Sequence, residues 1–251
     1  MAETPARPRR ARSEPVIRPL EPRDREAVRE ICCRTAFRNL GSDRFFEDRE
    51  VHADYRTSFH TDHHPGESWV VELDGRVIGY FLGCSDQALY LRVMARRIVP
   101  RAAAKALWRL VTGRCRRPET RRYLRHMLLR GAREAPKIDF ARYPAHYHCN
   151  ILRPGYGRGL YSRLTLMFLD HLERIGVDRL HGFITEPPDE GVWQRFADRY
   201  DVAKAEVTVE APTTLFRDVI GDDRPMVNRG WGMPVAGYRG WIEWLRDTRN
   251  L

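Results

Sequence analysis

The sequence predicts a mixed α/β fold in which a largely antiparallel sheet is flanked by helices. Two observations carry this prediction. Two apolar stretches joined by Asp74-Gly75 have the pattern of a β-hairpin, because this dipeptide tolerates the positive φ of a tight turn. Further along, an apolar strand runs into a glycine-rich loop, which opens a long amphipathic helix. The chain of 251 residues is long enough to bury a sizeable core.

The N-terminal half contains short patterns that define its elements in order. Residues 1–14 are rich in Pro, Arg and Ala and have no hydrophobic period, so we expect a disordered basic tail. A first strand is expected at 16–20 and a helix at 24–39, followed by a less regular helix at 45–59. The hairpin is expected at 68–84.

A basic segment, residues 86–135, comes next. Between residues 87 and 134 there are 14 Lys and Arg against two acidic residues, whereas the net charge of the whole chain is only +10. Two or three helices with apolar stripes are expected here. Strand patterns resume afterwards, so the segment is predicted to be a helical insertion between the third and fourth strands. The acidic remainder makes nucleic acid an unlikely partner overall, although nucleic acid or an anionic membrane surface stays an alternative for this segment.

The C-terminal half completes a predicted domain at residues 15–220. Its expected elements are a strand at 146–152, a long helix ending at Gly176, a strand at 180–185, a short helix at 191–200, and paired strands at 205–209 and 214–219. Residues 221–251 are rich in Trp and Gly. They are expected to form a C-terminal extension that packs on this domain.

Several protein classes do not fit the composition. No apolar run approaches the roughly 20 residues of a membrane span, and the N-terminal residues lack the apolar core of a secretory signal. Five cysteines without paired spacing argue against a disulfide framework and a zinc site. We therefore expect a cytoplasmic protein without bound metal. A polar loop explains the remaining cluster of metal-ligand types better than a metal site does; this cluster is His60, Asp62, His63 and His64.

The loop at residues 153–162 reads Arg-Pro-Gly-Tyr-Gly-Arg-Gly-Leu-Tyr-Ser. Its glycines let the backbone approach an anion closely. The first N–H groups of the following helix have no internal acceptor, so together with the helix dipole they predict a pyrophosphate site. A dinucleotide fingerprint would need a glycine where Ser162 stands, and a Walker loop would need Gly-Lys-Ser/Thr. A plain strand–turn–helix connection is the other interpretation.

The order of elements over residues 16–219 resembles that of the GNAT acetyltransferases. Residues 72–80, Glu-Leu-Asp-Gly-Arg-Val-Ile-Gly-Tyr, are similar to the hairpin of that superfamily. Residues 143–152, Tyr-Pro-Ala-His-Tyr-His-Cys-Asn-Ile-Leu, resemble the "YPAHLHI" strand of a bacterial branch, also seen in acetyltransferase-like domains attached to some O-GlcNAcases. The resemblance implies a GNAT-type fold, acetyl-CoA as co-substrate, and a small-molecule or peptide amine as acceptor.

The acetyl-CoA signature of the superfamily is Gln/Arg-x-x-Gly-x-Gly/Ala. Here Tyr156 takes its first position, Gly159 the central glycine and Tyr161 the final small residue, so two of these three positions depart from the pattern. The pantetheine of the superfamily pairs with the strand before the loop. The resemblance thus implies a cofactor site made of Ile151, Leu152, Arg153, Tyr156, Gly157, Arg158, Gly159, Leu160 and Tyr161.

Amine attack on a thioester needs a base for the amine and an acid for the leaving thiolate. His148 shares one face of its strand with His146 and Asn150, and a histidine suits a general base, although a structural role is the other interpretation. Glu186, after the next strand, is a second candidate base; it could instead cap a helix.

The superfamily's tyrosine acid falls on Ala197, so Tyr200, nearly one turn along the expected helix, becomes the candidate acid. Alternatively, water replaces the missing tyrosine as the acid, or catalysis is weak or absent. The leading functional prediction is an acyl-CoA-dependent N-acetyltransferase with an unidentified acceptor. The alternatives are a catalytically weakened GNAT-like binding or regulatory module, and a basic nucleic-acid- or membrane-associating protein. The sequence leaves the oligomeric state open, with a homodimer as one option.

Overall fold

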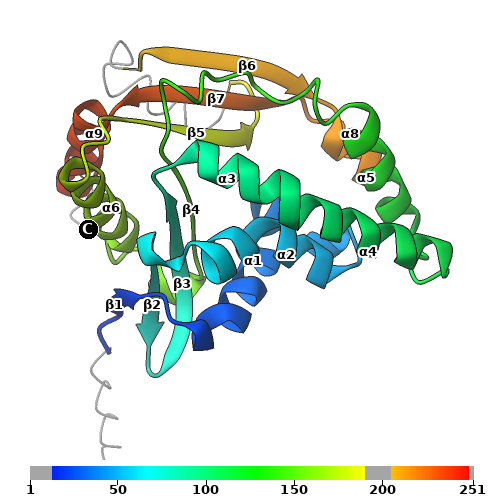
Figure 1. Ribbon diagram of the computed structural model, residues 1–251, viewed down its shortest axis with the longest axis horizontal. Coiled ribbons are helices and arrows are strands. Elements are labelled where there is room, and N and C mark those ends of the chain that lie inside the picture. The colour runs from blue at the N-terminus through cyan, green and yellow to red at the C-terminus, as the bar shows by residue number, and fades with distance from the viewer. Residues whose placement is uncertain (1–12, 190–204, 249–251) are drawn as a thin grey trace, which may run out of the picture.

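The computed structural model describes residues 13–189 and 205–248, which contain two antiparallel sheets (Figure 1). The first sheet has the order β1-β2-β3-β4 and the second the order β5-β7-β6. The strands are β1 (Val16–Pro19), β2 (Ser68–Leu73), β3 (Arg76–Cys84), β4 (His146–Ile151), β5 (Arg179–Glu186), β6 (Val207–Thr213) and β7 (Met226–Pro234).

Within the described residues, one isolated β-bridge joins the two sheets, at the start of β4 and β5. Ala145, just before β4, forms a parallel bridge with Leu180, and the His181 N–H donates to the Ala145 carbonyl at 2.8 Å. Beyond this bridge the two strands diverge, so the sheets splay apart (Figure 1). Among the described strands only β3 pairs with β4 along its length, so the other edge of β4 is unpaired beyond the bridge at Ala145.

Helices cover both faces of the first sheet. The helices are α1 (Arg25–Asn39), α2 (Arg49–Ser58), α3 (Gln87–Val93), α4 (Val99–Val111), α5 (Pro118–Leu129), α6 (Leu160–Arg174), α8 (Leu215–Ile220) and α9 (Val235–Thr248). Because side chains alternate along β3, Tyr80 and Leu82 pack with Val28 of α1, whereas Phe81 packs with Phe168 of α6. Helix α9 lies beside α6 on that second face (Figure 1).

Short helical turns complete the connections. They are Pro22–Asp24, Ser42–Arg44, Pro65–Glu67 and Arg153–Gly155, together with the π-helical segments Phe59–His63 and Met94–Ile98. None of the helices in the described parts of the chain has both the length and the apolarity required to cross a bilayer.

The predicted hairpin and the predicted long helix are both confirmed. Asp74 and Gly75 turn between β2 and β3 with φ of 50° and 72°. Helix α6 ends at Arg174, and Gly176 follows with φ of 76°. Helix α1 is present at the expected place, but its backbone leaves helical geometry at Ala36–Arg38.

The strand expected at 214–219 is wrong, because these residues form α8. Phe216 and Val219 are buried at helical spacing beside Phe45, which a strand would not allow. The partner of β6 is instead β7, which comes from the 221–251 segment and is the central strand of the second sheet. The expected tail at 1–14 lies mostly, and the expected helix at 191–200 entirely, outside the described residues.

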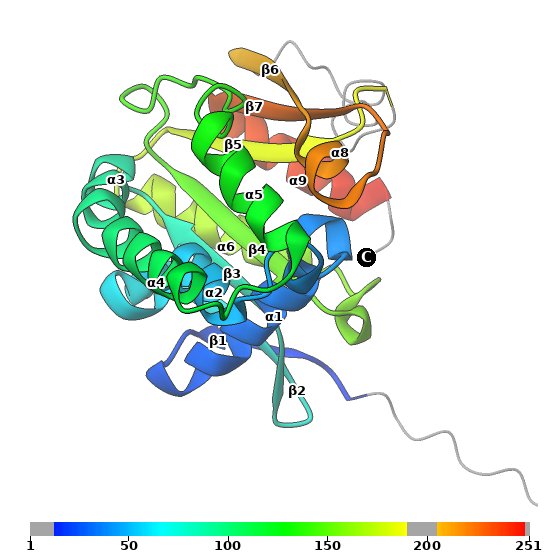
Figure 2. The same ribbon diagram turned by 90° about the vertical axis from the view of Figure 1, so that its right-hand side faces the viewer.

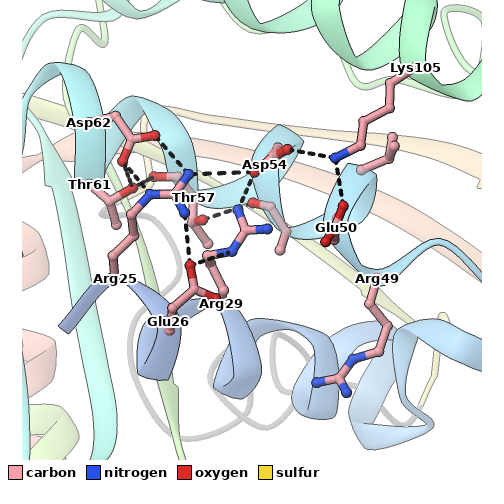
Figure 3. A network of polar contacts seen from close by, with 12 residues as sticks. Arg25, Glu26, Arg29, Arg49, Glu50, Asp54, Thr57, Thr61, Asp62 and Lys105 are labelled. Atoms are coloured by element: carbon pink, nitrogen blue, oxygen red, sulfur yellow. Dashed lines mark hydrogen bonds and ion pairs between the residues drawn. The ribbon is translucent and has the colours of Figure 1, made fainter. Parts of the chain in front are cut away.

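The basic segment forms α3, α4 and α5 between β3 and β4, viewed from the side in Figure 2. It is held against α2 by ion pairs (Figure 3). The Lys105 ammonium of α4 lies 2.8 Å from Glu50 and 3.6 Å from Asp54. Arg109 lies 3.0 Å from Glu50 and also pairs with Asp48, the N-cap of α2. These cations of the segment are therefore neutralised within the protein.

Candidate functional site

A trough follows the open edge of β4 where β4 and β5 diverge. One cavity of about 260 Å³ is lined by β4, β5, β7 and α9, and a second of about 380 Å³ is lined by the glycine-rich loop and the start of α6. Both cavities include Cys149 and Tyr161, so they are contiguous along β4. The trough leads from the loop to the gap between the sheets.

The backbone of β4 presents hydrogen-bonding groups to this trough. The Leu152 N–H donates to the Ile78 carbonyl at 2.8 Å, and in an antiparallel pair the residues that bond to a neighbour alternate with those that face away. Tyr147, Cys149 and Ile151 therefore turn their N–H and C=O groups to the open edge. A ligand with amide groups in an extended chain can pair with them as an added strand would.

The glycine-rich loop has the geometry of an anion site. Gly157 and Gly159 have φ of 70° and 65°, in the left-handed region that favours glycine. The Arg163 N–H donates to the Gly159 carbonyl at 3.0 Å, so the N–H groups of the first turn of α6, at residues 160–162, have no intrahelical acceptor. Together with the positive end of the helix dipole they favour a bound phosphate.

The structure spreads the predicted cofactor residues over neighbouring cavities. Six of them line the trough: Ile151, Tyr156, Gly157, Gly159, Leu160 and Tyr161. Leu152 and Arg153 line an adjacent cavity of about 840 Å³, together with Tyr156. The Arg158 guanidinium donates to the Ser13 carbonyl at 3.0 Å.

Sequence reasoning missed the residues that line the loop cavity from outside the strand–loop–helix stretch: Thr35, Asn39 and Leu245. Asn39 has a φ of 67° at the end of α1, a conformation that asparagine tolerates. The asparagine itself was therefore the local signal in the sequence for this position. Leu245 comes from α9, and nothing in its local sequence places it beside the loop.

His148 lies on the face of β4 opposite Tyr147 and lines the trough. Burial, and then the positive charge of Arg56, lower the pKa of His148 to about 3. Its Nδ1 lies 3.4 Å from the Tyr80 hydroxyl, which accepts a 2.6 Å hydrogen bond from the Asn150 amide. The imidazole is thus neutral but weakly basic, which weakens the general-base interpretation and favours the structural one.

Glu186 does not have the setting expected of a base. Its carboxylate pairs with the Arg229 guanidinium, and the side chains are 0% and 2% exposed. Arg229 Nε also donates to Glu210 at 2.9 Å. Because the carboxylate is buried and paired with a guanidinium, this setting weakens the general-base interpretation of Glu186.

The last predicted site residues to consider are Tyr200 and the cluster of metal-ligand types. Tyr200 and Ala197 lie outside the described residues. In the cluster of metal-ligand types, His60 Nδ1 lies 3.0 Å from the Gly83 carbonyl and Asp62 pairs with Arg25 at 2.8 Å. Within residues 13–189 and 205–248, no group of three or more His, Cys, Asp or Glu side chains is arranged to hold a metal ion.

Three tyrosine hydroxyls meet in the cavity between the sheets. Tyr147 of β4 lies 2.6 Å from Tyr161 of α6 and also hydrogen-bonds Tyr238 of α9, which lies 3.0 Å from Tyr161. All three side chains line the cavity. Sequence reasoning missed this cluster because Tyr238 is 77 residues away from Tyr161 along the chain.

The architecture, antiparallel sheets flanked by helices, matches the GNAT acetyltransferase fold. The chain is similar to the crystal structure of SsHAT, with 24% identity, coverage of 88% of this chain and 98% of that chain, and a TM-score of 0.54. At this identity the similarity establishes the fold alone.

Two other solved structures have TM-scores below 0.5. An N-acetyltransferase from Staphylococcus aureus Mu50 is 11% identical, with coverage of 89% and 99% and a TM-score of 0.46. The yncA protein from Salmonella typhimurium, solved with acetyl-CoA, is 15% identical, with coverage of 88% and 94% and a TM-score of 0.47. No protein-family model matches the chain, and no curated protein matches it in sequence.

Proposed function

We propose that the protein is an N-acetyltransferase that transfers the acetyl group of acetyl-CoA to an amine. The trough carries this proposal, because an anion site at a helix N-terminus continues directly into an open strand edge. Acetyl-CoA joins a pyrophosphate to an extended chain with two amides and a thioester, so its parts match these two features in order.

Different residues of the trough would then bind different parts of acetyl-CoA. The N–H groups of residues 160–162 and the loop glycines would hold the pyrophosphate. The edge of β4 at Cys149 and Ile151 would pair with the pantetheine amides, which brings the thioester to the cavity between the sheets. Holding both reactants there removes much of the entropic barrier to amine attack.

We also propose that the chain belongs to the GNAT branch with the "YPAHLHI" strand. Two features of residues 143–152 support this placement. Ala145 makes the bridge between the sheets, and the Tyr143 carbonyl lies 2.7 Å from His181 Nδ1, so this stretch fixes the point where the trough begins.

Calorimetry and thermal melting with acetyl-CoA and CoA test the binding step. We expect a rise in the melting temperature, since a ligand that binds only the native state stabilises it, and a Kd in the micromolar range, about −8 kcal/mol. Pantetheine and adenosine 3′,5′-bisphosphate are the controls. Each should bind more weakly than CoA because it occupies only part of the trough.

A panel of amines, amino sugars and peptides then tests transfer, with release of the free CoA thiol as the readout. Turnover of one acceptor class would support the enzyme. Tight CoA binding without any transfer would favour the binding or regulatory module instead. No response to millimolar CoA would remove the proposal altogether.

A further inference from the structure

The three tyrosines of the trough form a closed hydrogen-bonded triangle. Each hydroxyl lies within hydrogen-bond distance of the other two, and each comes from a different element. Their rings are held by stacking: Tyr147 lies on Phe81 with ring centroids 4.5 Å apart, and Tyr238 lies on Trp231 at 5.0 Å. The triangle is therefore a fixed group rather than a chance approach of mobile side chains.

The triangle has a chemical property that a single tyrosine lacks. Three hydroxyls hold three protons, so one of them can donate outward while the other two donate to its oxygen. If that hydroxyl loses its proton, the phenolate still accepts two short hydrogen bonds, which stabilise the negative charge.

We infer that Tyr147 is the proton donor to the leaving sulfur of acetyl-CoA, and that Tyr161 and Tyr238 are positioning residues that stabilise its phenolate. This inference rests on the proposed function. Tyr147 is chosen because it hydrogen-bonds both partners and belongs to β4, whose edge the thioester would follow. Tyr238 is 1% exposed, which suits a positioning residue.

The step balances as follows. The amine nitrogen forms a bond to the thioester carbon, and the carbon–sulfur bond breaks with its electron pair on sulfur. The Tyr147 hydroxyl proton moves to the sulfur, which leaves as the CoA thiol. The nitrogen gives up one proton to water, and the Tyr147 phenolate recovers a proton from water, so the protein returns to its starting state.

The surroundings keep the donor protonated before reaction. Burial raises the pKa of all three tyrosines above the usual value. The titratable groups that face Tyr147 are Tyr161 from α6, Tyr238 from α9 and Cys149 from its own strand. Phe81 of β3 and Phe168 of α6 supply an apolar wall. The hydroxyl is therefore a neutral donor at pH 7.

Tyr147→Phe in the full-length protein tests the inference. General-acid catalysis typically contributes about 10²–10⁴-fold, so we expect kcat to fall by about 100-fold or more, with the Kd for acetyl-CoA changed less than threefold. Tyr161→Phe and Tyr238→Phe should each reduce kcat by about tenfold. Tyr55→Phe, on the exposed side of α2, is the matched control and should leave kcat unchanged.

The pH profile separates proton donation from a merely structural role. Because burial raises the pKa of Tyr147 well above its usual value, kcat of the wild-type protein should fall only at strongly alkaline pH, and this basic limb should be absent from Tyr147→Phe. Replacing Tyr147 by 3-fluorotyrosine keeps its shape but lowers its pKa, so the basic limb should move to lower pH. This second variant covers the case in which Tyr147→Phe does not fold.

Two outcomes would overturn the inference while leaving the proposed function intact. They are a kcat of Tyr147→Phe within twofold of the wild type, and a basic limb that does not respond to fluorination. A wild-type protein that neither binds nor consumes acetyl-CoA would instead remove the proposed function, and with it the inference. Wild-type binding and turnover are therefore measured first.

Discussion

The second sheet and the basic segment use charged side chains in opposite ways. In the second sheet, Glu186 and Arg229 pair in the protein interior. In the basic segment, Lys105 and Glu50 pair at the surface, with 35% and 61% of their side chains exposed. Breaking a buried pair leaves an uncompensated charge, whereas an exposed pair contributes little. The number of charges in a sequence therefore does not indicate where charge matters energetically.

The largest effect is expected from breaking the buried pair. Arg229→Met should lower the free energy of unfolding by about 3–5 kcal/mol, because it removes the guanidinium that pairs with the buried Glu186 carboxylate. Lys105→Met is the matched control in the basic segment and should cost less than about 1 kcal/mol. Urea denaturation measures both.

The double variant Glu186→Met with Arg229→Met sharpens this comparison. It should recover part of the loss, since apolar replacement of both partners is often tolerated. If Arg229→Met and Lys105→Met cost the same, burial would not be the reason for the difference between the two regions.

The next largest effect is expected on CoA affinity, and it distinguishes two glycines that have the same backbone conformation. Gly159 opens α6 with φ of 65°, and Gly113 follows α4 with φ of 69° and open space around it. A valine at either position is strained by about 1–2 kcal/mol. Only Gly159→Val should also weaken CoA binding, by at least about 30-fold or about 2 kcal/mol, because its side chain would stand where backbone meets phosphate.

Circular dichroism first shows whether both glycine variants are folded. Calorimetry with CoA then shows whether only Gly159→Val weakens CoA binding. Equal CoA affinity in Gly159→Val and Gly113→Val would mean that the glycine-rich loop is only a turn.

Acid should lower the free energy of unfolding through two buried histidines. Burial lowers the pKa of His60 and His181 to about 4, so these side chains are neutral in the fold but protonate near pH 6.5 when unfolded. Between these values the unfolded state binds more protons, so stability falls as the pH falls from about 6.5 to 4. Each histidine contributes a slope of up to about 1.4 kcal/mol per pH unit.

Urea denaturation across this pH range measures the slope. His60→Gln should reduce it, since glutamine does not titrate. A slope that is unchanged in this variant would contradict the role assigned to the buried imidazole.

The smallest effect is expected at the contact between α4 and α2. Arg109→Gln removes the cation beside the buried N-cap Asp48, but the carboxylate keeps its hydrogen bonds from the Glu50 and Val51 N–H groups. The variant should therefore cost about 1 kcal/mol of stability. The CoA affinity should stay within twofold, because neither side chain lines the trough. A loss of CoA binding in this variant would show that the basic segment acts on the site.

Elements set by neighbouring residues were predictable. Asp74-Gly75 defines the hairpin, and Gly176 ends α6, because turns and helix caps depend on local backbone conformation. The strand expected at 214–219 failed because its apolar residues also fit a helix, and packing against Phe45 decided between them.

The candidate site also has a part that was predictable from local sequence and a part that was not. The glycine-rich loop could be found because its glycines and the following helix are contiguous. The buried pair of Glu186 and Arg229 could not be found, because Arg229 lies 43 residues further along the chain. The tyrosine triangle could not be found at all, since no pattern in the sequence links β4, α6 and α9.

The sequence by itself determined the hairpin, the glycine-rich loop and the helix that follows it, because each depends on interactions within a few residues. Only the tertiary structure decided that β7 enters the second sheet, that β4 keeps an open edge, and that three tyrosines meet beside it. These features depend on which distant segments pack together. Such packing follows from burying the whole apolar surface at once, and no local stretch of sequence encodes it.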